Sequence, residues 1–245
     1  TLADDLGTTG TRLGAVALDA AAIDADGAIH AASLAITSAA SVDFAATVDL
    51  TGTASADATA ADIVFNDGLI AGTASFLNTG ILQLGSAAND VSTIGAGGLV
   101  HTAGNTTLFG SLTAGAGGID LAAVTFGSDV DLDAGTAAIS LGPLTGGVHD
   151  IAVTADSIAL GGDWSGSGSR LVQPGTAARA ILLAGAASEL ALDVNELDRL
   201  FAGSPEAVTI GRADGSGVLT TGAFSADDPL TLRGGAMTFA GTLSK

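Results

Sequence analysis

The chain of 245 residues carries 26 acidic and 7 basic residues, for a formal net charge of −19, so its surface is expected to repel nucleic acid and anionic membranes. It has no cysteine, and no apolar run reaches the roughly 18 residues of a membrane helix, which excludes a disulfide framework and insertion into a bilayer. Aromatic residues make up only 4% of the chain, and much of its apolar content is alanine, which predicts a thin core.

Residues 1–13 carry little pattern and are interpreted as an entry segment. From residue 14 onward a three-residue unit recurs, in which a small or polar residue lies between two apolar ones, as in Val16-Ala17-Leu18 and Val42-Asp43-Phe44. Because neighbouring side chains of a strand point to opposite faces, this alternation predicts short strands with the middle residue outward. We therefore predict one elongated all-β domain over residues 14–245.

The repeat is clearest in residues 118–160, which read GIDLAAVTFGSDVDLDAGTAAISLGPLTGGVHDIAVTADSIAL. Units led by Ile119, Ile139 and Ile158 recur about every 20 residues. A similar spacing separates four upstream residues that are each expected to point into the core: Ile23, Val42, Ile63 and Ile81. A period of about 20 is typical of a β-solenoid, in which each turn of chain, or rung, lays three short strands around a narrow core and stacks about 4.8 Å from the next.

Two features interrupt this rhythm in the last third of the chain. Residues 161–169 form a Gly/Ser-rich run that contains Trp164, and they are predicted to be a flexible break. Residues 195–202 are predicted to form a short helix, with Asn195 as its N-cap, Gly203 just after its end and Pro205 blocking its continuation. Strands are expected to resume after this helix.

The helix lies in a run that carries a family resemblance. Residues 189–224 read ELALDVNELDRLFAGSPEAVTIGRADGSGVLTTGAF, and the run resembles a module of filamentous-haemagglutinin-like bacterial exoproteins, in which a short helix precedes a turn and renewed solenoid strands. The resemblance implies a right-handed parallel β-helix, export, and display at the cell surface. Because the chain starts at Thr1 without that family's secretion domain, we expect a segment or a processed subunit of something longer.

One acidic run superficially matches a calcium-binding loop. Asp129, Asp131 and Asp133 alternate with apolar residues, so their side chains are expected to line one outer strand face, roughly 6.6 Å apart along the chain. That spacing makes a ladder rather than the turning loop of an EF-hand. Asp24 and Asp26 are interpreted as turn residues. No metal site is therefore assigned, although calcium binding to the acidic face remains open.

No residues are assigned to catalysis or to a cofactor. His30, His101 and His149 lie far apart and are each expected to be exposed or at a corner. Polysaccharide-cleaving β-helices need acidic residues with nearby bases and aromatic platforms, yet no Lys or Arg lies between Leu13 and Ser169. We therefore expect that the protein is not an enzyme.

Two functional hypotheses follow. The first is a structural stalk, or filament-forming segment, of a secreted bacterial adhesin at the cell surface. The second is a module that binds glycans or another cell through a lateral face. Because the sequence offers no polar cap at either end, we expect both ends to be covered by adjoining segments or by other copies stacked end to end, in a rod of roughly 12 rungs.

Overall fold

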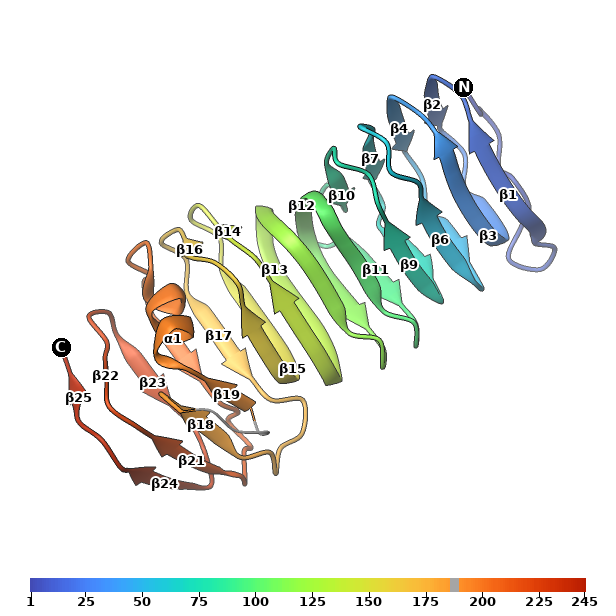
Figure 1. The fold of residues 1–245 in the computed structure, drawn as a ribbon. Helices are drawn as coiled ribbons and strands as arrows, with labels where there is room; N and C mark the ends of the chain where they lie inside the picture. Colours follow the sequence, from blue (N-terminus) through green and yellow to red (C-terminus); the bar gives the residue numbers. More distant parts are fainter. Residues whose placement is uncertain (186–189) are drawn as a thin grey trace.

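The computed structural model describes residues 1–185 and 190–245, which form a parallel β-solenoid of about 11 turns. Strands make up 55% of it and helix 3%. The turns stack along one axis, so that the molecule is a rod with its termini at opposite ends (Figure 1). The all-β solenoid fold and its one short helix, as predicted from the sequence, are therefore confirmed.

The strands align in three columns that run along the rod, each a parallel ladder from rung to rung. The first column contains β1 (Leu13–Asp19), β6 (Thr53–Ala56), β9 (Thr73–Phe76), β19 (Leu190–Leu192), β18 (Ile181–Leu183), β21 (Val218–Thr221) and β24 (Ala236–Phe239). The second contains β2 (Ala22–Ala25), β4 (Ser41–Phe44), β7 (Asp62–Phe65), β10 (Leu82–Leu84), β14 (Leu144–Thr145), β16 (Trp164–Ser165), β22 (Phe224–Ser225) and β25 (Leu243–Ser244).

The third column contains β5 (Val48–Leu50), β8 (Leu69–Ala71), β11 (Val91–Ile94), β17 (Arg170–Gln173), β20 (Val208–Ile210) and β23 (Leu230–Leu232). Four longer strands bend through more than one column: β3 (Ile29–Ser38), β12 (Leu99–Ala114), β13 (Ile119–Leu141) and β15 (Ile151–Leu160). Paired residues of successive rungs, such as Ile139 and Ile158, lie about 20 positions apart in the chain, which is the spacing expected.

Side chains alternate between core and surface along the strands. In β4, Val42 and Phe44 are buried while Asp43 is exposed. The buried residues of successive rungs then stack on one another: the rings of Phe44 and Phe65 are parallel, with centroids 4.9 Å apart, and Phe76 meets Phe65 edge-on at 5.8 Å. The core is therefore a thin apolar column enclosed by the three strand ladders.

The structure corrects the expected positions of Ile81 and Trp164. Ile81 was expected in the core but is 41% exposed, and Leu82 points inward instead and pairs with Ile63. Either Ile81 or Leu82 could supply an inward apolar side chain in this run. With Leu82 inward, the polar Gln83 points outward. Trp164, expected in a flexible run, is fully buried in β16, which pairs with β14, so the rung continues through residues 161–169.

The chain makes a long excursion between β17 and β20. These two strands are neighbours in the third column, with Arg170 paired to Val208, yet β18, β19 and the helix lie between them in the sequence. β19 pairs with β18 on one side and contacts β15 on the other, while β18 pairs with β21. The order of β18 and β19 along the rod is therefore the reverse of their order in the chain.

Helix α1 (Val194–Phe201) begins earlier than expected. Its N-cap is Asp193, not Asn195, because Asp193 forms a reciprocal capping box with Glu196, which gives two otherwise unpaired amides a partner. The helix ends as the sequence predicted, with Gly203 just beyond it at a φ of +82°, a conformation that favours glycine.

The helix takes the place of a strand in the second column. It buries Leu197 and Leu200 and contacts β16 and β22. The Glu196 carboxylate accepts a hydrogen bond from the Leu160 amide at 3.1 Å, and the Arg199 guanidinium donates to the Leu160 carbonyl. These two side chains thereby give the Leu160 backbone the pairing that a neighbouring strand would supply.

Candidate functional site

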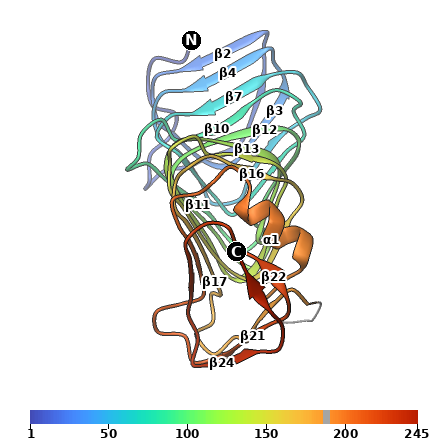
Figure 2. The same cartoon turned by 90° about the vertical axis from the view of Figure 1, so that its left-hand side faces the viewer.

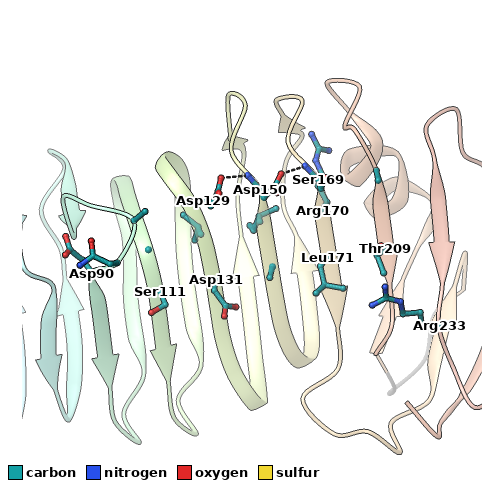
Figure 3. Close-up of a pocket in the computed structure, with 17 residues that line it drawn as sticks. Asp90, Ser111, Asp129, Asp131, Asp150, Ser169, Arg170, Leu171, Thr209 and Arg233 are labelled. Carbon is teal, nitrogen blue, oxygen red and sulfur yellow. Dashed lines mark hydrogen bonds between the residues drawn. The ribbon is translucent and has the colours of Figure 1, made fainter. Parts of the chain in front are cut away.

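A groove of about 600 Å³ runs along the third column and is the candidate site (Figure 3). Its floor is a row of outward side chains, one from each of β12, β13, β15, β17 and β20, that are paired in register from rung to rung: Ser111, Asp131, Ala152, Leu171 and Thr209. The row faces outward because its members alternate with buried residues such as Val130 and Leu132. The strand pattern that builds the core thus also builds the groove.

One wall of the groove is the corner that precedes these strands. There the Asp129 carboxylate accepts a hydrogen bond from the Asp150 amide at 2.9 Å, and the Asp150 carboxylate accepts one from the Ser169 amide at 2.7 Å, as the dashed lines in Figure 3 show. Asp90 likewise accepts from the amides of its own turn. Each of these carboxylates has a structural role, which is to pair a corner amide.

The groove is acidic over most of its length. Asp131 is exposed, but partial desolvation by the surrounding groove, and then the neighbouring Asp133, raise the pKa of its carboxyl. Arg170 lines the groove, but its guanidinium donates to the Leu200 and Gly166 carbonyls, and burial lowers its pKa to about 10. Arg233 lies at the C-terminal end of the groove, away from Asp131 in Figure 3. The arrangement favours a cationic or hydroxyl-rich ligand over an anionic one.

The predicted acidic ladder is present. Asp129 and Asp131 are exposed on the outer face and Asp133 is half-buried, where its carboxylate accepts a hydrogen bond from the Gly135 amide at 2.7 Å. Among the described residues no group of three or more acidic or histidine side chains could hold a metal ion. The three carboxylates are thus spread along one outer strand face.

The three histidines lie in three different environments. His149, at a corner, is 3.6 Å from the Asp129 carboxylate, and half-buried His30 is 3.3 Å from that of Asp49, which Arg12 also contacts at 2.6 Å. The Arg12 hydrogen bond, more than the His30 contact, lowers the pKa of the Asp49 carboxyl. The contacts of Arg12 and His30 with Asp49 tie the first rungs together, and neither His30 nor His149 lines the groove.

His101 contradicts the expectation of an exposed or corner position. It is fully buried, with Nδ1 at 2.8 Å from the Thr106 hydroxyl and Nε2 at 3.1 Å from the Asn78 carbonyl. A carbonyl only accepts, so Nε2 carries the proton and the Thr106 hydroxyl donates to Nδ1. Burial lowers the pKa of His101, so the imidazole is held neutral. The sequence signal for this was the apolar unit Leu99-Val100-His101, in which His101 takes an inward position.

The sequence did not indicate the groove. Its floor residues are unremarkable singly and lie on five strands far apart in the chain, and only the register of the rungs brings them together.

Comparison with protein families, curated proteins and solved structures finds no match for this chain. None of the helices in the described part of the chain is long and apolar enough to cross a membrane. The geometry thus defines the class as a parallel β-solenoid.

Proposed function

We propose that this chain is a non-catalytic structural stalk in a secreted bacterial adhesin, and that it holds other parts of the assembly away from the cell surface. The observation that supports this most is the parallel stack, which is continuous in the third column from β3 to β23: about 11 turns at about 4.8 Å each give a rod of roughly 50 Å. Backbone hydrogen bonds join each rung of this column to the next, which gives the rod the stiffness that a spacer needs.

Two further features support the proposal. The strongly acidic surface, with a net charge of −19, favours solubility and discourages lateral association between like-charged rods. The run 189–224 resembles a module of filamentous-haemagglutinin-like exoproteins, and in this chain the helix of that run fills a strand position in the solenoid, so the module extends the rod. The adhesin context and the location at the cell surface rest on that resemblance.

A rigid spacer must keep a fixed distance between its ends, and this can be measured. The chain has no cysteine, so Ser38→Cys and Thr238→Cys provide two unique spin-label sites on exposed positions near opposite ends. About ten rungs separate them, so electron–electron resonance should give one narrow distance of roughly 45–50 Å. As a control, Ser38→Cys with Ser140→Cys should give about half that distance.

A broad or multimodal distribution for the long pair, with a narrow one for the short pair, would show that the rod bends between its halves. The stalk proposal would then be wrong.

The groove favours a second function, which is recognition of a glycan or of another cell through the lateral face. Asp131 is the test residue because it lies on the groove floor and its carboxylate makes no hydrogen bond among the described residues. If the groove binds, Asp131→Asn should weaken attachment of the chain to cells or immobilised glycans, while Asp120→Asn, outside the groove on the same strand, should not. Equal attachment of both variants would leave the stalk as the function.

A further inference from the structure

The groove lies on the flank of the rod that the third column forms, where Figure 2 shows β11 and β17. Side-chain size along its floor alternates from rung to rung. The larger side chains of Asp131 and Leu171 lie two rungs apart in one row (Figure 3), and the small Ala152 lies on the rung between them. The alternation continues toward the N-terminus, where Ser111 separates Asp131 from Val91. Because rungs stack about 4.8 Å apart, these raised positions repeat about every 9.6 Å.

Among the regular conformations of a protein chain, polyproline II matches this period best. It has three residues per turn and rises about 3.1 Å per residue, so every third side chain faces the same way at a spacing of about 9.3 Å. A β-strand presents side chains to one face about every 6.6–6.8 Å. Two turns of an α-helix span about 10.8 Å. A polyproline II segment along the groove can therefore place successive third residues over the low positions between the raised ones.

Hydroxyl groups lie at two of these low positions. Ser111 and Thr209 flank Ala152 at two rungs on either side, and neither hydroxyl makes a hydrogen bond among the described residues. The two residues are thus four rungs, or about 19 Å, apart. Two polyproline II turns span about 18.6 Å, and their backbone carbonyls have no internal partner. Both hydroxyls can therefore donate to carbonyls of the same bound segment.

The acidic groups of the groove select the charge of the segment. Asp131 lies on the floor next to Ala152, and Asp150 lies on the wall of the same rung as Ala152. Asp129 and Asp150 each use Oδ1 to pair a corner amide, so Oδ2 of each is left for a ligand. The buried Arg170 guanidinium is held by backbone carbonyls. A lysine or arginine over Ala152 therefore meets acidic groups from the floor and the wall.

We propose that the groove binds a proline-rich segment of a partner protein in the polyproline II conformation, with a lysine or arginine of the segment over Ala152, between Asp131 and Asp150, and a proline ring against Leu171. This inference rests on the second function proposed for the groove, recognition through the lateral face, and names its ligand. The stalk function does not depend on it. Because polyproline II is already formed in the free segment, docking costs little conformational entropy.

The test is fluorescence anisotropy with the whole chain and three labelled peptides. The first is PPAPPKPPA, in which every third residue faces the groove and the central one is lysine. The second, PPAPPEPPA, reverses the charge of that residue. The third, GSAGSKGSA, keeps the charge and abolishes the polyproline II conformation. The first peptide should bind about tenfold or more tightly than either of the others.

Two pairs of variants test the charge and the period separately. Asp131→Asn should weaken binding of PPAPPKPPA about fivefold, whereas Asp120→Asn, outside the groove on the same strand, should not. Ala152→Leu fills the low position between two raised ones and should weaken binding about tenfold or more. Ala159→Leu makes the same substitution at an exposed position of the same strand and should leave binding unchanged. Circular dichroism confirms that each variant is folded.

Three results would each overturn the proposal: no binding of PPAPPKPPA at millimolar concentration, equal binding of GSAGSKGSA, or unchanged binding by Ala152→Leu. A labelled chitosan oligomer tests the cationic glycan. If the oligomer binds through Asp131 and the peptide does not, the groove recognises a glycan and the proline-rich ligand is wrong. Attachment to cells that depends on Asp131 without any peptide binding would refute the proline-rich ligand alone and leave recognition through the lateral face standing.

Discussion

Replacing Ile139 with alanine tests the stacked core at the middle of the rod. Ile139 is 1% exposed and pairs with Ile158 of the next rung. The substitution removes three carbon atoms, which at about 0.8 kcal/mol each lowers the free energy of unfolding by roughly 2.4 kcal/mol. The strand ladders hold successive rungs at fixed spacing, so the space cannot collapse, and the remaining cavity should bring the total loss to about 3–4 kcal/mol.

The assay is urea unfolding followed by circular dichroism, with Ser140→Ala as the matched control. Ser140 is the next residue on the same strand and points outward, so its truncation should change the free energy of unfolding by less than about 0.5 kcal/mol. Equal losses for the two variants would refute the assignment of inward and outward faces. A loss below about 1 kcal/mol for Ile139→Ala would refute close packing between rungs.

Three further predictions concern charged and titrating groups. The pKa of buried His101 lies below its ordinary value of 6.5, so the imidazole binds a proton more readily in the unfolded chain than in the folded one. The free energy of unfolding should therefore fall as pH drops from 7 to 5, and should fall less in His101→Gln. The same pH slope in both proteins would contradict a buried neutral imidazole. Arg170→Met should leave the Leu200 and Gly166 carbonyls without their guanidinium donor, and should therefore speed hydrogen exchange in α1. Arg233→Met, at an exposed site, should not change the exchange rate. Unchanged exchange in Arg170→Met would show that Arg170 does not hold the helix. Calcium should raise the melting temperature no more than sodium at equal ionic strength, because the acidic residues form a ladder; saturable calcium-specific stabilisation would revive a metal site.

The fold could be predicted from the sequence because a solenoid repeats one local rule. The apolar–polar–apolar units set the inward face of each strand, and Ile139, Val42 and Phe44 lie where that rule places them. The rule was misapplied at residue 81, because the apolar Ile81 directly precedes the unit Leu82-Gln83-Leu84, which is the one that obeys the rule. It also failed for Trp164, because Gly/Ser neighbours suggested a loop while the size of the ring favoured burial.

The candidate site could not be predicted, because it depends on which rungs become neighbours. The groove floor combines Ser111, Asp131 and Thr209 through the register of parallel strands, and no local pattern encodes that register. The reversed order of β18 and β19 has the same cause: the units 181–183 and 190–192 are both apolar at the first and third positions, so either could pair with its neighbours. The N-cap was predicted at the wrong residue because Asp193 caps the helix through reciprocal hydrogen bonds with Glu196, and the type of the cap residue alone does not reveal that pairing.

The account's central claim is that the described rungs form one rigid rod, as a spacer requires. The distance between spin labels at Ser38→Cys and Thr238→Cys tests that claim most directly. The account predicts one narrow distance of roughly 45–50 Å, because about ten rungs at about 4.8 Å each separate the two positions. A broad or multimodal distance distribution would contradict it.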